Sequence, residues 1–211
     1  LAANLGSMLT PMGNPQNLYL YGQSGMTLME FMAVTLPFTA VSALCLGMSV
    51  FICKNNKINV KISKPVPEEN YKILLPVYTV LFILCILCVA KLIPAVAAAA
   101  VVFTVILTAD RSSLKIVDYS LLGTFIGFFI FIGNMSRISW FRDFLEDIID
   151  GHEIIVTELS SQIISNVPSA LLLSGFTTDY TGLIIGSNIG GLGTMIASMA
   201  SLISYRQLAK A

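Results

Sequence analysis

Charged residues are scarce in this sequence. Asp, Glu, Lys and Arg account for 11% of its 211 residues and hydrophobic residues for 55%, whereas roughly 25% charge is usual in soluble domains. A soluble globule could not cover its surface with so few charges, which excludes that class. The 12 basic residues balance the 12 acidic ones, so no basic field is present to attract nucleic acid. We therefore predict an integral membrane protein with no nucleic-acid partner.

Groups that carry catalysis are also scarce. The one histidine, His152, is predicted to lie in a solvated loop. The cysteines lie in apolar runs, where we interpret them as packing thiols: Cys45, Cys53, Cys85 and Cys88. These runs contain no His–Cys cluster that could bind a metal and no nucleophile beside a paired base. We therefore predict that the protein is not an enzyme and needs no cofactor, a coupling Na⁺ aside.

Long runs without any charged residue dominate the sequence. They cover residues 1–29, 31–53, 73–90, 92–109, 119–136, 159–178 and 180–205. Several reach the roughly 20 residues that a helix needs to cross ~30 Å of hydrocarbon. Alternation of apolar and polar residues is absent, which favours helices over a β-barrel. We predict an all-α membrane protein, a multi-span helical bundle in the plasma membrane, here the inner membrane of a prokaryote.

The lysines predict how the spans are oriented. The polar stretch 54–72 holds several lysines, so it is cytoplasmic by the positive-inside rule. The predicted spans are 27–53, 73–90, 92–109, 119–136 and 180–205, and they place most of the other basic residues inside as well. This balance holds if the segment 153–178 enters and leaves the membrane on the same side.

The segment 153–178 has the length of a re-entrant helical hairpin. Its first arm, 153–165, is too short to span the bilayer, and Ser165, Asn166 and Pro168 favour a turn after it. The alternative is one kinked span of about 25 residues. The lysine distribution favours the hairpin.

The region between the fourth span and the hairpin has an amphipathic pattern. Over 137–150, Phe141, Phe144 and Ile148 share one helix face, and charged residues occupy the other. We predict a helix that lies in the membrane interface with Trp140 as its anchor.

Two uncharged segments share one pattern of polar residues. The spacing of Asn4, Gly6 and Thr10 recurs in Asn188, Gly190 and Thr194. The predicted topology runs these segments in opposite directions. Inverted repeats with interrupted helices are typical of secondary transporters, in which unwound helices hold substrate and ion near the midplane. Half-helix N-termini would attract an anion, and freed carbonyls with Asn, Ser or Thr oxygens would coordinate Na⁺.

Each glycine in such a pattern has a second interpretation, which is close helix packing through small residues. We prefer packing for Gly123 and Gly127, which have no polar neighbours. For Gly190, Gly191 and Gly193 we prefer an unwound binding segment, because Asn and Thr stand beside them.

The polar segments resemble those of a known group. The sequences ANLGSMLTPMGNPQN, SNVP and GSNIGGLGTMIAS, together with residues 117–135, are similar to the ion transporter superfamily, which includes citrate and dicarboxylate carriers, arsenite permeases and sodium/proton antiporters. The resemblance implies an elevator-type homodimer whose hairpin tips and unwound loops bind a small anionic substrate and Na⁺ or H⁺. The repeat-mate of Asn166 would precede Leu1. We therefore expect this chain to be a C-terminal portion that lacks the N-terminal portion of the transporter.

The family motifs imply a binding site divided between two halves. Its predicted residues are Asn4, Gly6, Ser7, Thr10, Gly13, Asn14, Ser165, Asn166, Pro168, Asn188, Gly190, Gly193 and Thr194. Glu158 and Gln162 share a helix face that leads to the hairpin tip and are candidates for coupling to a proton or cation. Val167 stands where the dicarboxylate branch has a hydroxyl residue, which we interpret as evidence against a dicarboxylate.

We divide the chain into three parts. Residues 1–25 end a first transport unit with an unwound helix, and 26–152 form scaffold spans. Residues 153–211 form a second transport unit from the hairpin and an unwound helix over 179–206. The predicted function is secondary active transport of an anion such as a carboxylate or oxyanion, coupled to Na⁺ or H⁺ by an elevator mechanism. The alternatives are arsenite or metalloid efflux, Na⁺/H⁺ antiport, or a structural fragment that does not transport.

Overall fold

The computed structural model describes residues 2–52, 71–198, 201 and 205. Every regular element within these ranges is helical, which confirms the all-α prediction. In chain order the elements are α1 (Ala2–Gly6), the 3-10 turn η1 (Pro11–Gly13), α2 (Pro15–Ser24), α3 (Leu28–Ile52), α4 (Tyr71–Val89), α5 (Ala95–Ala109), α6 (Arg111–Leu114), α7 (Tyr119–Met135), α8 (Ser139–Ile149), α9 (Glu153–Ile164), α10 (Asn166–Leu173) and α11 (Tyr180–Gly190). Most of the lysine-rich stretch 54–72 and most of the final predicted span beyond 198 lie outside the described residues.

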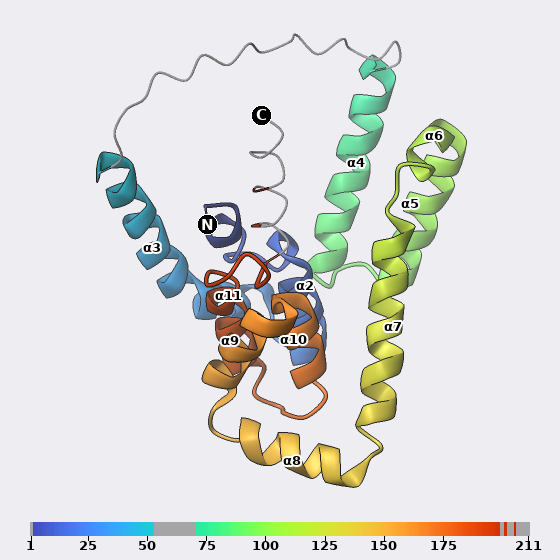
Figure 1. Ribbon diagram of the computed structural model, residues 1–211. Helices are drawn as coiled ribbons and strands as arrows, with labels where there is room; N and C mark the ends of the chain where they lie inside the picture. The colour runs from blue at the N-terminus through green and yellow to red at the C-terminus, as the bar shows by residue number, and fades with distance from the viewer. Residues whose placement is uncertain (1, 53–70, 199–200, 202–204, 206–211) are drawn as a thin grey trace. The chain divides into compact units, whose positions relative to one another are not determined.

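Two of the described helices are long and apolar enough to cross a membrane. They are α3 and α4, which occupy the predicted spans 27–53 and 73–90. The apolar helix α5 has only 15 residues, because it begins after Pro94. Helices α7 and α8 meet at a bend of 102° (Figure 1). Such a bend is expected where a span is followed by a helix that lies along the interface.

The chain divides into two compact units. One comprises residues 1–52 and 120–211 and contains every residue of the predicted binding site. The other comprises residues 53–119, and in its described part α5 packs against both α4 and α6. The candidate site can therefore be built within the first unit alone.

The carboxylate of Asp110 links the helices of the second unit through hydrogen bonds. Asp110 lies between α5 and α6 and accepts a hydrogen bond from the Tyr78 hydroxyl of α4 at 2.7 Å. It also caps α6 by accepting from the backbone N–H of Ser113 at 3.4 Å. Side-chain hydrogen bonds, the largest from Ser112, lower the pKa of the Asp110 carboxyl well below its usual range. The group therefore stays ionised at neutral pH.

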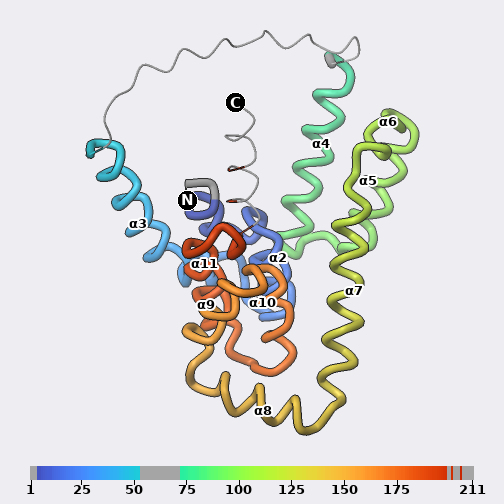
Figure 2. Tube along the Cα trace, viewed as in Figure 1, coloured from blue at the N-terminus to red at the C-terminus, as the bar shows by residue number. Residues whose placement is uncertain are grey.

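The centre of the first unit is a bundle of short helices. Helices α9 and α10 form a hairpin, since the chain reverses direction between them (Figure 2). Helix α11 packs along α9, and α2 packs against both α10 and α11. In lipid there is little hydrophobic drive between helices, so close packing has to hold such a bundle together.

Glycines on α11 allow the close approach to α9. A Cβ at Gly186 would lie 2.6 Å from the carbonyl oxygen of Ile154, and one at Gly190 would lie 2.8 Å from a side-chain carbon of α9. Packing through small residues is therefore found at these two positions. A Cβ at Gly123 or Gly127 would meet no described heavy atom within 4 Å, so the packing role predicted for that pair finds no partner among the described residues and stays a prediction.

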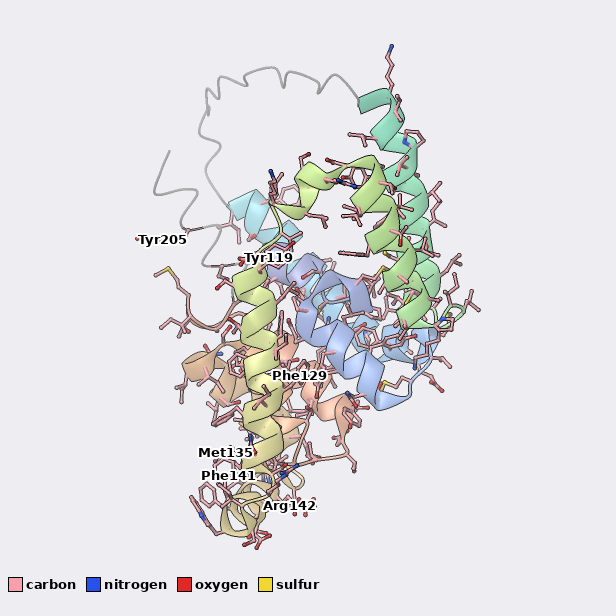
Figure 3. All side chains as sticks on the ribbon, turned by 90° about the vertical axis from the view of Figure 1, so that its right-hand side faces the viewer. Tyr119, Phe129, Met135, Phe141, Arg142 and Tyr205 are labelled. Atoms are coloured by element: carbon pink, nitrogen blue, oxygen red, sulfur yellow. The ribbon has the colours of Figure 1, made fainter. Side chains whose placement is uncertain are left out.

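Apolar contacts join α7 and α8 to the bundle. Ile132 of α7 packs in one cluster with residues of α10. The ring of Tyr19 on α2 lies 5.5 Å from that of Phe129 on α7. The ring of Phe141 on α8 lies 5.8 Å from that of Phe176, just after α10. Figure 3 labels Phe129 on α7 and Phe141 on α8.

Helix α8 has the amphipathic character predicted for residues 137–150. Trp140 and Phe144 expose most of their side chains, as an interfacial helix requires. Its polar residues include Arg142, which pairs with Glu146 one turn later at 2.6 Å. Helix α8 thus exposes apolar side chains, and its place in the membrane interface stays a prediction.

The packing of α11 on α9 can be tested with two glycine variants. Gly186→Ala should lower the free energy of unfolding by about 1–3 kcal/mol, the usual effect of overpacking, because its Cβ would meet a backbone carbonyl. Gly123→Ala is the matched control in open space and should change stability little. Thermal melting in detergent measures both, and equal melting temperatures would contradict the packing described here.

Candidate functional site

The first helix break separates α1 from α2. The chain leaves the helix after Gly6, and Thr10 adopts an extended backbone with φ −118° and ψ 150° before the short turn η1. The Ser7 hydroxyl bridges the break, at 2.9 Å from the Asn4 carbonyl and 2.7 Å from Asn14 Oδ1. Gly13 is required at its position because a Cβ there would overlap the backbone carbonyl of Ser7.

The second helix break follows α11. Helix α11 ends at Gly190, and residues 191–197 contain no regular helix. The carbonyl of Gly191 accepts a hydrogen bond from Asn4 Nδ2 at 2.8 Å. Gln162 of α9 contacts the same stretch through Gly190 and Thr194. The second break is therefore held by side chains from α1 and α9.

Asparagines join the two breaks directly. Asn14 Nδ2 donates to Asn188 Oδ1 at 3.4 Å. Asn188 Nδ2 in turn donates to Asn17 Oδ1 at 2.7 Å and to the carbonyl of Ile184 at 2.8 Å. All three asparagines are buried. Residues far apart in the sequence thus form one hydrogen-bonded amide cluster.

The hairpin tip contacts the second break. Ser165 has a φ of +75°, which is rare for a residue other than glycine and makes the sharp turn into α10. The next residue, Asn166, donates its backbone N–H to the Ala197 carbonyl at 2.9 Å. Its side chain is 3% exposed, and Nδ2 lies so close to Gly191 that a Cβ there would be 2.9 Å away. Pro168 lies in the first turn of α10.

The structure thus brings together most of the residues predicted from the sequence. They are Asn4, Ser7, Gly13, Asn14, Ser165, Asn166, Asn188 and Gly190. Gly193 and Thr194 lie beside Gln162 in the exposed part of the second break. Gly6 is exposed with open space around its Cα, and Thr10 is half-buried in the first break. Gly190 has a packing role on α9 in addition to its contact with Gln162.

Several buried polar residues were not predicted from the sequence, and three of them are notable. Asn17 is fully buried and bonds both Asn188 and the carbonyl of Met8. Gln16 and Thr157 each bury a polar side-chain atom that has no partner in the described part of the chain. The motif Asn14–Pro15–Gln16–Asn17 contains the signal for two of them, since polar residues rarely follow one another in an apolar segment without a partner.

The side chain of Val167 points away from the polar residues of the tip. It packs in an apolar cluster with Ile132 of α7 and Leu171 of α10. A hydroxyl at this position would therefore face α7. The interpretation of Val167 as evidence against a dicarboxylate loses its structural basis.

The region around the breaks contains few charges. Residues 1–53 and 143–205 include no Lys or Arg. Glu158 of α9 is half-buried, and no hydrogen bond or ion pair reaches its carboxylate within the described residues. The site can therefore offer amide and backbone donors and acceptors, with one carboxylate nearby.

The amide cluster is closed in this structure. A cavity of about 10 Å³ adjoins Asn188, with Met8 and Thr35 among its other lining residues, and holds at most one water. A wider opening of about 550 Å³ lies between α8 and the loop 174–180. It shares no lining residue with the predicted site.

Comparison with known proteins gives matches along nearly the whole chain. The chain is 35% identical over 207 residues to the uncharacterized transporter MJ0456 of Methanocaldococcus jannaschii. It is 32% identical over 213 residues to the inner membrane protein YbiR of Escherichia coli. Each alignment covers 98% of this chain and 56% of the relative. The chain therefore spans little more than half the length of these relatives.

No solved structure gives a significant match to the chain. Residues 1–180 match the citrate transporter family, and this range contains the first helix break and the whole hairpin. The superfamily resemblance seen in the sequence motifs is confirmed by this match and by the two relatives. The chain belongs to the citrate transporter family.

Proposed function

We propose that this protein is a secondary active transporter that carries an anion, such as a carboxylate or an oxyanion, across the plasma membrane with Na⁺ or H⁺. The observation that carries the proposal is the meeting of two helix breaks and a hairpin tip in one cluster of buried amides. Unwound backbone in a membrane persists only where it is buried in protein or lines a cavity. Helix breaks of this kind form the binding sites of many transporters.

The chemistry of the cluster favours an anion held by hydrogen bonds. Asn4 and Asn166 both direct Nδ2 groups toward Gly191, and the N-terminus of α2 follows Asn14 without a side-chain cap. Helix N-termini carry partial positive charge and unpaired N–H groups. Together these donors suit carboxylate or oxyanion oxygens once the bundle has opened.

The lack of basic residues favours coupling to a cation. An anion moved into this region meets no Lys or Arg, because residues 1–53 and 143–205 have none. An unpaired charge near the centre of a bilayer costs at least ~2.5–3.5 kcal/mol. A Na⁺ bound by asparagine and backbone oxygens, or a proton on Glu158, would offset that cost. The half-buried position of Glu158 is consistent with its taking up a proton.

The packing on α7 is compatible with an elevator movement. The hairpin meets α7 through apolar side chains, Val167 and Leu171 against Ile132. The polar contacts of the tip go instead to the second break. A contact without hydrogen bonds can slide at low cost, whereas the amide cluster would move as one body.

Ligand binding can be tested with asparagine variants. Citrate, succinate, sulfate and arsenite should be added to the detergent-purified chain, with Na⁺ or K⁺ at one ionic strength. We expect an anion to raise the melting temperature only with Na⁺ or at acid pH, because binding is proposed to need a coupled cation. A ligand at 100 times its Kd stabilises the folded protein by ~2.7 kcal/mol. Asn166→Ala and Asn188→Ala should abolish the shift, each measured against its own ligand-free melting temperature.

The matched control is Asn134→Ala. Asn134 lies on α7, and among the described residues its side chain bonds within its own helix turn, to the Ile130 carbonyl. This variant should keep the full ligand-induced shift. If both site variants keep it as well, the asparagines do not belong to the binding site. A shift with arsenite alone would favour the metalloid alternative.

Transport itself can be tested in proteoliposomes. Uptake of the labelled anion that binds best should require an inward gradient of Na⁺ or of protons, and Glu158→Gln should remove only the proton-driven component. Binding without uptake under either gradient would refute transport by this chain and favour the structural alternative.

A further inference from the structure

The side chain of Gln162 fills the place of a missing helical hydrogen bond. If α11 continued beyond Gly190, the carbonyl of Gly190 would accept from the backbone N–H of Thr194 four residues later. Instead, Gln162 Nε2 donates to that carbonyl at 2.5 Å and Oε1 accepts from that N–H at 2.9 Å. One carboxamide therefore satisfies both of these groups.

We propose that Gln162 is the positioning residue that keeps the second break open and fixes the hairpin to it. The importance of this role for transport rests on the proposed function, but the contact itself does not. Sequence reasoning treats Gln162 as a candidate for coupling. Its side chain makes three hydrogen bonds, to the backbone of Glu158, Gly190 and Thr194, and these assign it instead to the backbone.

Glycine at position 193 is part of the same arrangement. A Cβ at Gly193 would overlap the carboxamide of Gln162. Thr194 adds a second link, because its hydroxyl donates to the backbone carbonyl of Gln162 at 3.3 Å. The side chain of Gln162 thus occupies the space beside Gly193.

The carboxamide of Gln162 bridges the Gly190 carbonyl and the Thr194 N–H. This bridge affects the position of the hairpin tip because Gln162 and the tip belong to one chain segment. Gln162 lies in the last turn of α9, and Asn166 begins α10. Asn166 bonds the Ala197 carbonyl, so the segment contacts the break at both ends. Loss of the bridge would free one end and let Asn166 shift relative to Gly191.

The chemistry of the bridge requires a group that donates on one side and accepts on the other. An amide does so at any pH, and a carboxyl group does so only when it is protonated. An ionised glutamate could accept from Thr194 N–H but would repel the carbonyl of Gly190. Gln162→Glu should therefore convert a pH-independent bridge into a pH-dependent one.

The experiment measures backbone hydrogen exchange over residues 191–198 of the full chain in detergent, at pH 5 and pH 8, corrected for intrinsic rates. We expect Gln162→Ala to speed exchange at Thr194 by about tenfold at both values, as the loss of one hydrogen bond implies. Gln162→Glu should show the same increase at pH 8 and near wild-type protection at pH 5. Gly193→Ala should reproduce the effect of Gln162→Ala, because it displaces the carboxamide.

Two controls match these variants. Gln23→Glu alters an exposed glutamine of α2, and Gly133→Ala adds a methyl group where no described atom lies within 4 Å. Both should exchange like the wild type. Wild-type exchange in Gln162→Ala, or no pH dependence in Gln162→Glu, would overturn the proposal.

Anion uptake should then depend on whether the Gln162 bridge is intact. In proteoliposomes, Gln162→Glu should recover uptake relative to wild type as the pH falls from 8 to 5, and Gln162→Ala should not. If the exchange results hold while the wild type transports no anion, the proposed function fails and the bridge stands. If the wild type transports and the exchange results fail, only the bridge is refuted.

Discussion

Breaking a helix inside a membrane sets free backbone groups that neither lipid nor water can satisfy, and this constraint explains most of the polar residues of the first unit. Each unpaired group costs several kcal/mol in hydrocarbon. Here the freed carbonyls of Met8, Gly190 and Gly191 accept hydrogen bonds from side-chain amides. Asn and Gln supply donors and acceptors without a charge, so their transfer into a bilayer costs less than that of Lys or Asp. A sequence poor in charge can therefore still build a polar centre.

The two breaks are satisfied in different ways, and this difference determines which segments are linked. At the first break, Ser7 and Asn17 bond residues of their own segment, and Thr35 of α3 donates to the Leu9 carbonyl at 3.0 Å. At the second, the partners come from α1 and from the hairpin. A movement that separates α1 from the hairpin therefore has to disturb the second break, whereas the first can keep its internal bonds. Under the proposed function, the second break is where opening of the bundle would act most directly on binding.

The sequence predicted the helices well because apolar runs and breakers act locally. The spans over 27–53 and 73–90, the amphipathic helix over 137–150 and the turn at Ser165 all correspond to described elements. Contacts between elements could not be predicted with the same success. The side chain of Val167 faces α7 because of the way α10 is rotated about its own axis. The positive φ of Ser165, just before α10, sets that rotation. The role of Gln162 depends on α9 lying against the end of α11. Neither fact is encoded at short range.

The closed amide cluster also bears on how a substrate could be selected. Asn14, Asn17 and Asn188 satisfy one another in this structure, so a ligand has to replace amide bonds that already exist. Hydrogen bonds to a charged group are stronger than those among neutral amides, so each exchanged bond favours the anion. An uncoupled anion would leave its charge without a partner. A cation that binds the freed Oδ1 atoms would supply that partner, and this is the physical reason for the coupling proposed above.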